Sequence, residues 1–165
     1  MVFYCVGLTA DFRRHPFDTV EAHVSFLSNV LSIARIDSLI YLSSTRVYAR
    51  AQQTDELQPL LAAPQDADDL YNLSKLMGES LVLSSTGMGQ VVRLSNVIGP
   101  KMGPTNFVGS IIDEAANTGK VQFRTSLDSS KDYLWIDDAI EGLEAVLPRH
   151  PVAHGAQVIA EMHFV

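Results

Sequence analysis

Short apolar segments alternate with helical segments along most of this chain of 165 residues. The apolar or extended runs are Val2–Val6, Ser38–Ser43, Gln90–Leu94, Lys131–Ile136 and Gln157–Ala160. Helical spacing or helix-end residues mark Thr19–Ala34, Leu70–Ser85, Asn106–Thr118 and Asp137–Leu147. Because neighbouring parallel strands need long crossovers, usually helices, this order predicts an α/β fold with a parallel sheet and flanking helices.

Individual residues support the predicted helix boundaries. Asp68 and Asp69 fit a helix N-terminus, where carboxylates satisfy free amides and face the positive end of the helix dipole. Trp135 is expected in the hydrophobic core. The other end signals are Gly87, Gly119, the pair Asp137-Asp138 and Pro148.

The composition limits the partners of the chain. With 47% apolar and 19% charged residues, it fits a globular protein rather than a disordered one. The net charge of −7 disfavours nucleic acid, because a phosphate-binding surface needs clustered Lys and Arg. No basic segment precedes the first apolar run, and no run reaches the roughly 20 residues that span a bilayer. We therefore expect a cytoplasmic protein with no membrane partner.

Polar or glycine-containing segments follow three of the predicted strands. They are Gly7-Leu8-Thr9, Ser43-Ser44-Thr45 and Ser95-Asn96. In open parallel sheets, ligands bind in the crevice outside the carboxyl ends of the strands. These three segments are therefore expected to face one binding crevice.

Tyr71 and Lys75 lie four residues apart, on one face of a predicted helix. A free tyrosine has a pKa near 10, so only about one in a thousand is a phenolate at neutral pH. A nearby ammonium lowers that pKa, and a general base works best when its pKa is near the operating pH. Taken alone, however, the pair is better explained as two exposed side chains on a helix surface.

Five segments, in their order and spacing, resemble the extended short-chain dehydrogenases, that is, the NAD-dependent epimerase/dehydratase family. They are VFYCVG, YLSSTRVYA, YNLSK, VVRLSNVIGP and KDYLWIDDAIEGLEAVL. No single segment is specific, but the combination is, and it extends from Val2 to about Leu147. The resemblance implies a partial Rossmann-like parallel sheet that begins at the family's fourth strand.

The resemblance also implies a catalytic set. Tyr71 is similar to the base that takes a proton from a sugar hydroxyl while a hydride passes to the nicotinamide. Lys75 resembles the residue that lowers the tyrosine pKa and holds the nicotinamide ribose, and Ser44 the residue that hydrogen-bonds the reacting hydroxyl. The implied cofactor is NAD or NADP, and the implied substrate is a nucleotide sugar.

Further positions match cofactor or substrate contacts of the family. The implied cofactor-binding residues are Val6, Gly7, Leu8, Ser43, Tyr71, Lys75, Ser95 and Val97. The implied substrate-binding residues are Thr45, Asn96 and Lys131. Lys131 stands where many epimerases have an arginine for the sugar-nucleotide diphosphate, and a lysine offers only a point charge there.

Thr45 and Arg46 depart from one branch of the family. Sugar-nucleotide 4,6-dehydratases carry an Asp-Glu pair at these positions, which serves the elimination of water. The resemblance therefore favours epimerisation or keto-reduction over 4,6-dehydration.

A second departure concerns the cofactor diphosphate. The family binds it with a Gly-x-x-Gly-x-x-Gly turn at a helix N-terminus, and none of the ten glycines forms that motif. By the family pattern, residues 1–165 are expected to form one partial domain that lacks the glycine-rich half and most of the C-terminal substrate lobe. Cofactor binding is therefore expected to be weakened or lost.

Two functions stay open at this point. The first is an enzyme-derived chain, an NAD(P)-dependent nucleotide-sugar epimerase or reductase present as a fragment. The second is a non-catalytic remnant that only folds or dimerises. In the family, the helices that match 19–34 and 70–85 build the dimer interface, so a homodimer is expected through them.

Other polar groups are weaker candidates. His150, His154 and His163 are interpreted as a solvated tail rather than a metal site, because Pro151 interrupts any helix there and no carboxylate accompanies them. Arg13-Arg14-His15 fits a solvated loop better than a basic loop on the ligand side.

Overall fold

A computed structural model of the chain describes residues 1–8, 11–85, 88–103, 106–123, 126, 129–147 and 155–156. Its strands are β1 (Val2–Tyr4), β2 (Ser38–Ser44), β3 (Met88–Leu94), β4 (Asn96–Ile98), β5 (Tyr133–Trp135) and β6 (Gly155–Ala156). Its α-helices are α1 (Pro16–Val20), α2 (Phe26–Ile33), α3 (Asp69–Ser84), α4 (Phe107–Thr118) and α5 (Ile136–Ala145). A π-helical turn, η1 (Glu21–Ser25), joins α1 to α2, and a 3₁₀ turn, η2 (Thr45–Tyr48), follows β2.

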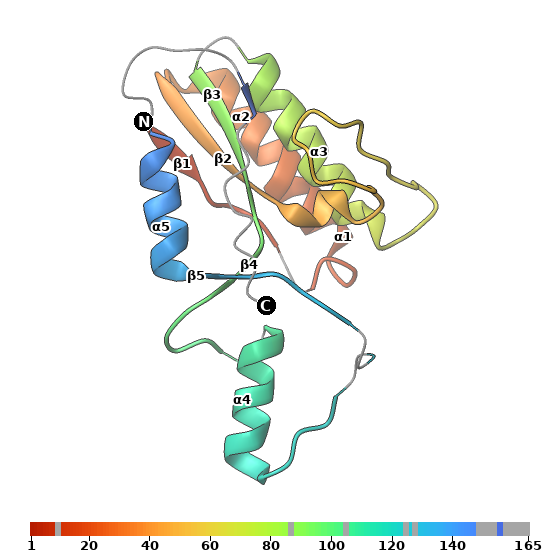
Figure 1. Cartoon of the computed structure of the whole chain (residues 1–165). Helices are drawn as coiled ribbons and strands as arrows, with labels where there is room; N and C mark the ends of the chain where they lie inside the picture. Colours follow the sequence, from red (N-terminus) through yellow and green to blue (C-terminus); the bar gives the residue numbers. More distant parts are fainter. Residues whose placement is uncertain are drawn as a thin grey trace.

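The strands form two parallel sheets. The larger sheet has the order β1-β2-β3-β6, and β4 pairs with β5 in a second sheet of two strands. Figure 1 shows α2 and α3 side by side on one face of the larger sheet, while α4 lies away from it. This architecture confirms the predicted α/β fold with parallel strands and flanking helices. The separate β4-β5 pair is a feature that the hydrophobic pattern did not predict.

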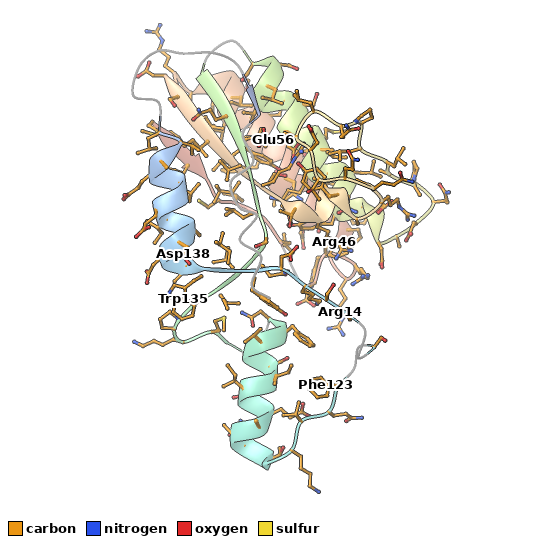
Figure 2. All side chains as sticks on the ribbon, viewed as in Figure 1. Arg14, Arg46, Glu56, Phe123, Trp135 and Asp138 are labelled. Carbon is orange, nitrogen blue, oxygen red and sulfur yellow. The ribbon has the colours of Figure 1, made fainter. Side chains whose placement is uncertain are left out.

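Several predicted boundaries differ from the observed ones. Asp68 occupies the N-cap of α3 without capping it, because its carboxylate pairs with Arg13. Asp69 instead accepts a hydrogen bond from the amide of Ala63, outside the helix. Trp135 is 39% exposed, so its prediction as a core residue is wrong, and its indole N–H donates to Asp137 at the surface (Figure 2).

The ends of α4 follow their sequence signals. Asn106 caps the helix by accepting a hydrogen bond from the amide of Gly109 at 2.6 Å. Gly119 closes it in the left-handed region, at φ 66°, where a side chain would be strained. The predictions for Gly87, Pro148 and Gln157–Ala160 concern residues outside the described part of the chain.

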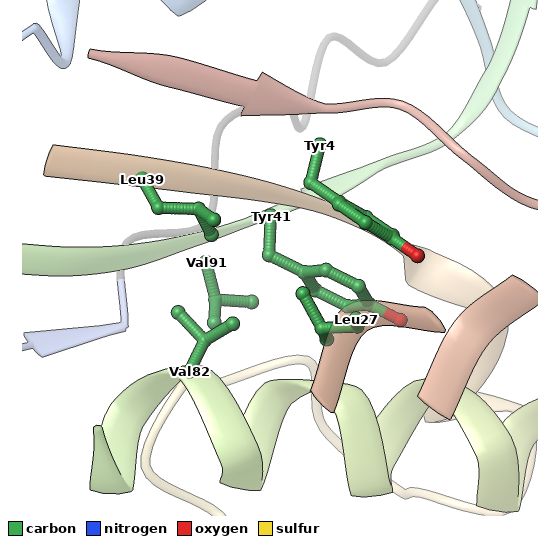
Figure 3. Close-up of a cluster of buried hydrophobic side chains, with 6 residues drawn as sticks. All are labelled: Tyr4, Leu27, Leu39, Tyr41, Val82 and Val91. Carbon is green, nitrogen blue, oxygen red and sulfur yellow. The ribbon is translucent and has the colours of Figure 1, made fainter. Parts of the chain in front are cut away.

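The core lies between the larger sheet and the helices α2 and α3 (Figure 3). Tyr4 and Tyr41, on neighbouring strands, stack with ring centroids 5.8 Å apart. Leu27 from α2 and Val82 from α3 are buried against this face. The remaining members of the cluster are Leu39 and Val91. Because α3 is fixed by this core, the residues of its first two turns are held beside the carboxyl end of β2.

Candidate active site

Tyr71 and Lys75 are both buried, at 6% and 5% exposure. They lie on the side of α3 that packs against β2 and η1. The interpretation of this pair as exposed surface residues is therefore wrong. Their burial means that each polar end must find a partner or change its pKa.

The Lys75 ammonium contacts a backbone carbonyl of β2. Its Nζ donates a hydrogen bond to the carbonyl of Leu42 in β2 at 2.9 Å. Burial lowers the pKa of Lys75 to about 8, while the negative charge of Glu79 acts in the opposite direction. Burial therefore makes Lys75 easier to deprotonate than an ordinary lysine.

Gly7 lies directly against Lys75 at the end of β1. A Cβ at position 7 would be 3.4 Å from Lys75 Nζ and 2.9 Å from His23 Nε2. The second distance is shorter than real Cβ contacts, so any side chain there would displace His23. The segment that follows β1 therefore approaches His23 closely because residue 7 is a glycine.

Tyr71 is surrounded by two aromatic rings and two polar groups. Its ring packs on Phe12, with centroids 5.4 Å apart, and meets His23 edge-on at 5.2 Å. Burial raises the pKa of Tyr71, while a hydrogen bond with Ser44 and the positive charge of Arg46 lower it. The expectation that Lys75 lowers this pKa differs from what the structure shows. Lys75 Nζ lies 6.0 Å from the Tyr71 ring centroid and is bound to Leu42.

His23 is a buried member of this cluster that the sequence did not indicate. It lies in the π-helical turn η1, and its Nδ1 is 2.8 Å from the Ser74 hydroxyl. Burial, then the charge of Lys75, lowers the pKa of His23 to about 4, while a backbone hydrogen bond with Leu8 raises it. His23 is therefore neutral at physiological pH. A lone histidine inside an apolar helical segment carries no spacing signal, although π-helical turns often occur at functional sites.

A buried ion pair supports the end of β2. Glu79 of α3 accepts hydrogen bonds from Arg93 Nε at 3.0 Å and Nη2 at 2.6 Å. Arg93 Nη1 also donates to Tyr48 at 2.6 Å. The Ser43 hydroxyl donates to Glu79 at 2.5 Å. The side chain of Ser43 is thus committed within the protein, and any cofactor contact from this residue would come from its backbone.

The remaining candidates lie on other elements. Val6 is 43% exposed beyond β1. Asn96 donates to the carbonyl of Asp132 at 3.0 Å, and Lys131 Nζ lies 4.8 Å from the Phe107 ring centroid. Across the described ranges, no recorded hydrogen bond or ion pair joins Asn96 or Lys131 to Tyr71. Four other candidate residues are described by their position in the fold. Leu8 follows β1, and Thr45 is the first residue of η2. Ser95 precedes β4, and Val97 of β4 pairs with Leu134 of β5.

The described residues offer neither a metal site nor a membrane-spanning helix. No group of three or more His, Cys, Asp or Glu side chains there could hold a metal ion. The predicted tail histidines 150, 154 and 163 lie outside this part of the chain. None of the described helices combines the length and apolar character needed to cross a membrane.

Comparisons with known proteins agree with this fold. A variant of UDP-glucuronic acid 4-epimerase from Bacillus cereus is similar with a TM-score of 0.78 and 18% identity, over 98% of this chain and 54% of that protein. A dTDP-glucose 4,6-dehydratase variant from Streptomyces venezuelae has a TM-score of 0.79 and 18% identity, over 96% and 50%. The chain thus spans about half the length of these relatives.

The family comparison covers nearly the whole sequence. No curated protein matches the chain. The model of the NAD dependent epimerase/dehydratase family matches residues 1–159. The chain therefore belongs to the NAD dependent epimerase/dehydratase family.

Proposed function

We propose that this chain carries the reacting half of an NAD(P)-dependent nucleotide-sugar epimerase or reductase. The observation that carries the proposal is the cluster of the half-buried Ser44 with the buried Tyr71 and Lys75, beside Gly7. Two similar solved structures contain NAD together with UDP-glucuronic acid or UDP-glucose. A nicotinamide cofactor supplies the hydride acceptor or donor for such chemistry.

The residues at the end of β1 fit a cofactor. Because Gly7 has no side chain, its backbone lies close to both His23 and Lys75. In the proposal, Lys75 donates to the ribose hydroxyls and the backbone of Gly7 and Leu8 lies along the cofactor. Because this sequence contains no glycine-rich turn for the diphosphate, we expect affinity for NAD in the millimolar range.

Tyr71 and Ser44 would perform the proton transfer. During oxidation the sugar hydroxyl would give its proton to the Tyr71 oxygen, while a bound nicotinamide would supply the hydride acceptor. During reduction Tyr71 returns that proton to the carbonyl oxygen, and Ser44 donates a hydrogen bond to the same oxygen. Burial favours the neutral phenol, so Ser44 and Arg46 are needed to make the phenolate accessible.

The finer expectations remain part of this proposal. Thr45, Asn96 and Lys131 would contact the substrate, and Ser43, Val6, Ser95 and Val97 the cofactor. With Arg46 at the position of a dehydratase acid, we propose epimerisation or reduction rather than 4,6-dehydration. The single partial domain, the cytoplasmic location and the homodimer are likewise proposed.

The test is the conversion of a panel of nucleotide sugars into their epimers, followed by NMR at saturating NAD, together with NADH consumption measured on keto-sugar nucleotides. We expect slow turnover that is abolished in Tyr71→Phe, with cofactor binding nearly unchanged. Turnover that survives in Tyr71→Phe would contradict the role of Tyr71. Absence of both turnover and NAD binding would favour the non-catalytic alternative.

A further inference from the structure

In the described part of the chain, Arg46 has no carboxylate partner, in contrast to Arg13 and Arg50. Among the described residues, no Asp or Glu oxygen lies within ion-pair distance of Arg46, whereas Arg13 pairs with Asp68. Arg50 pairs with Asp66 and Asp69. The carboxylates of these pairs are thus bound by other arginines, and Arg46 acts on Asp68 only at longer range, where its charge helps to lower the pKa of that carboxyl.

Aromatic rings hold the Arg46 guanidinium beside Tyr71. Its central carbon lies 5.0 Å from the Phe12 ring centroid and 5.7 Å from that of Tyr71. Phe12 is only 2% exposed, so the surface under the guanidinium is fixed. The one hydrogen bond recorded for the guanidinium is a long one, 3.4 Å from Nη2 to the carbonyl of Asp68. Most of its five donors are therefore free, and the side chain reaches solvent (Figure 2).

The position of Arg46 limits the ligand group that it can meet. Tyr71 interacts with Ser44, and in the proposed function these two residues contact the reacting hydroxyl. A guanidinium that lies over the Tyr71 ring is then within the width of one sugar ring of that hydroxyl. A planar fork of N–H donors matches a carboxylate, which it binds through two parallel hydrogen bonds.

We propose that Arg46 recognises a carboxylate on the sugar ring, so that the site selects nucleotide sugars of the uronic acid class. This inference rests on the proposed function, because it needs a nucleotide sugar at Tyr71. Solved structures similar to this chain hold UDP-glucuronic acid in one case and UDP-glucose in another. These two ligands share the nucleotide and the diphosphate and differ in the carboxylate, so they form a matched pair of probes.

The experiment measures the affinity of both probes in the presence of NAD. UDP-glucuronic acid and UDP-glucose are titrated by NMR into the wild-type chain, Arg46→Met and Arg46→Lys. Arg35→Met is the control, because Arg35 is exposed and lies before β2, at the end of the strand opposite Arg46. We expect the wild type to prefer the acidic sugar. Arg46→Met should lose about 10- to 100-fold in affinity for UDP-glucuronic acid alone, Arg46→Lys less, and Arg35→Met nothing.

Three results would overturn the inference. Equal loss for both sugars in Arg46→Met would mean that Arg46 binds the shared diphosphate. Equal affinities of the wild type and Arg46→Met for both sugars would mean that Arg46 has no role in selection, while the proposed function stands. Failure of the wild type to bind either sugar would remove this inference together with the proposed function.

Discussion

Burial sets the protonation of the titratable side chains around Tyr71. It raises the pKa of Tyr71, lowers that of Lys75 to about 8 and lowers that of His23 to about 4. Each shift favours the neutral form, which is the expected effect of a low-dielectric site. The nearby Arg46 opposes the shift of Tyr71, and it is the cation through which phenolate formation can be tuned.

His23 should make stability depend on pH below neutrality. Its pKa is 6.5 in an unfolded chain and about 4 in the folded one, so the unfolded state binds the proton more tightly. The free energy of unfolding should therefore rise with pH between about 4 and 6.5 and level off above that. The contribution is on the order of 3 kcal/mol. His23→Gln, which cannot titrate, should remove this part of the slope in urea denaturation series, whereas parallel curves for the two proteins would contradict the burial of a neutral His23.

Sequence spacing predicted which of these side chains lie near one another, but it did not predict their burial or their contacts. Tyr71 and Lys75, four apart on a helix, and Ser44 at a strand end do meet in space. Their burial and the stacking of Arg46 on Phe12 depend on contacts between distant segments, which periodicity does not contain. For the same reason, hydrophobic spacing could not indicate that His23 would lie beside them.

At the scale of elements, α3 connects the core to the site. Val82 packs in the hydrophobic cluster, and Glu79, one turn earlier, forms the buried ion pair with Arg93. Tyr71 and Lys75 occupy the first two turns. One helix therefore fixes the reacting side chains relative to the strands β2 and β3.

Breaking the Glu79–Arg93 pair should destabilise the fold strongly. Arg93→Met leaves a buried carboxylate whose remaining partner is Ser43, and Glu79→Leu leaves a buried guanidinium bound to Tyr48. Each single variant should lose about 3–5 kcal/mol of unfolding free energy. The double variant should lose clearly less than the sum of the two, because no unpaired charge remains. Additive losses in denaturant unfolding would show that the pair is not coupled.

The predicted elements agree best where local signals and packing coincide. The helices 70–85 and 106–118 were predicted to within about a residue, although only the second is bounded by its predicted cap and glycine, Asn106 and Gly119. The π-helical turn η1 depends on a change in hydrogen-bond partners that leaves no trace in hydrophobic spacing. The strand β4, only three residues long, is stabilised by its pairing with β5, nearly forty residues away in sequence.

At the scale of the whole molecule, apolar side chains are exposed on the helices 19–34 and 70–85, through which a homodimer is expected. Val20 is 37% exposed in α1, and Met77 is 56% exposed in α3. If these helices form the homodimer, Val20→Lys with Met77→Glu should give a folded monomer in sedimentation velocity. Ile112→Lys on α4, where Ile112 is 58% exposed, should leave the dimer unchanged. A wild-type chain that is monomeric at high concentration would contradict the proposed interface.

In the proposed function, a chain of about half the length of its similar structures holds the reacting residues. Here the strand end at Gly7, the buried Tyr71 and Lys75 and the free charge of Arg46 occur within one sheet edge and one helix. The parts that would hold a cofactor diphosphate are not represented by a motif in this sequence. We therefore expect a reacting site that is formed without the cofactor and a weak affinity for NAD.

An NAD titration followed by the amide signals of the chain tests this account most directly. The account predicts saturable shifts that are concentrated at Gly7, Leu8 and the segment from Tyr71 to Lys75, with a dissociation constant in the millimolar range. Lys75→Met should lose these shifts while keeping the folded spectrum. If the wild type shows no shift at the solubility limit of NAD, or if Lys75→Met shows the same shifts, Lys75 is not the cofactor contact and the central claim fails.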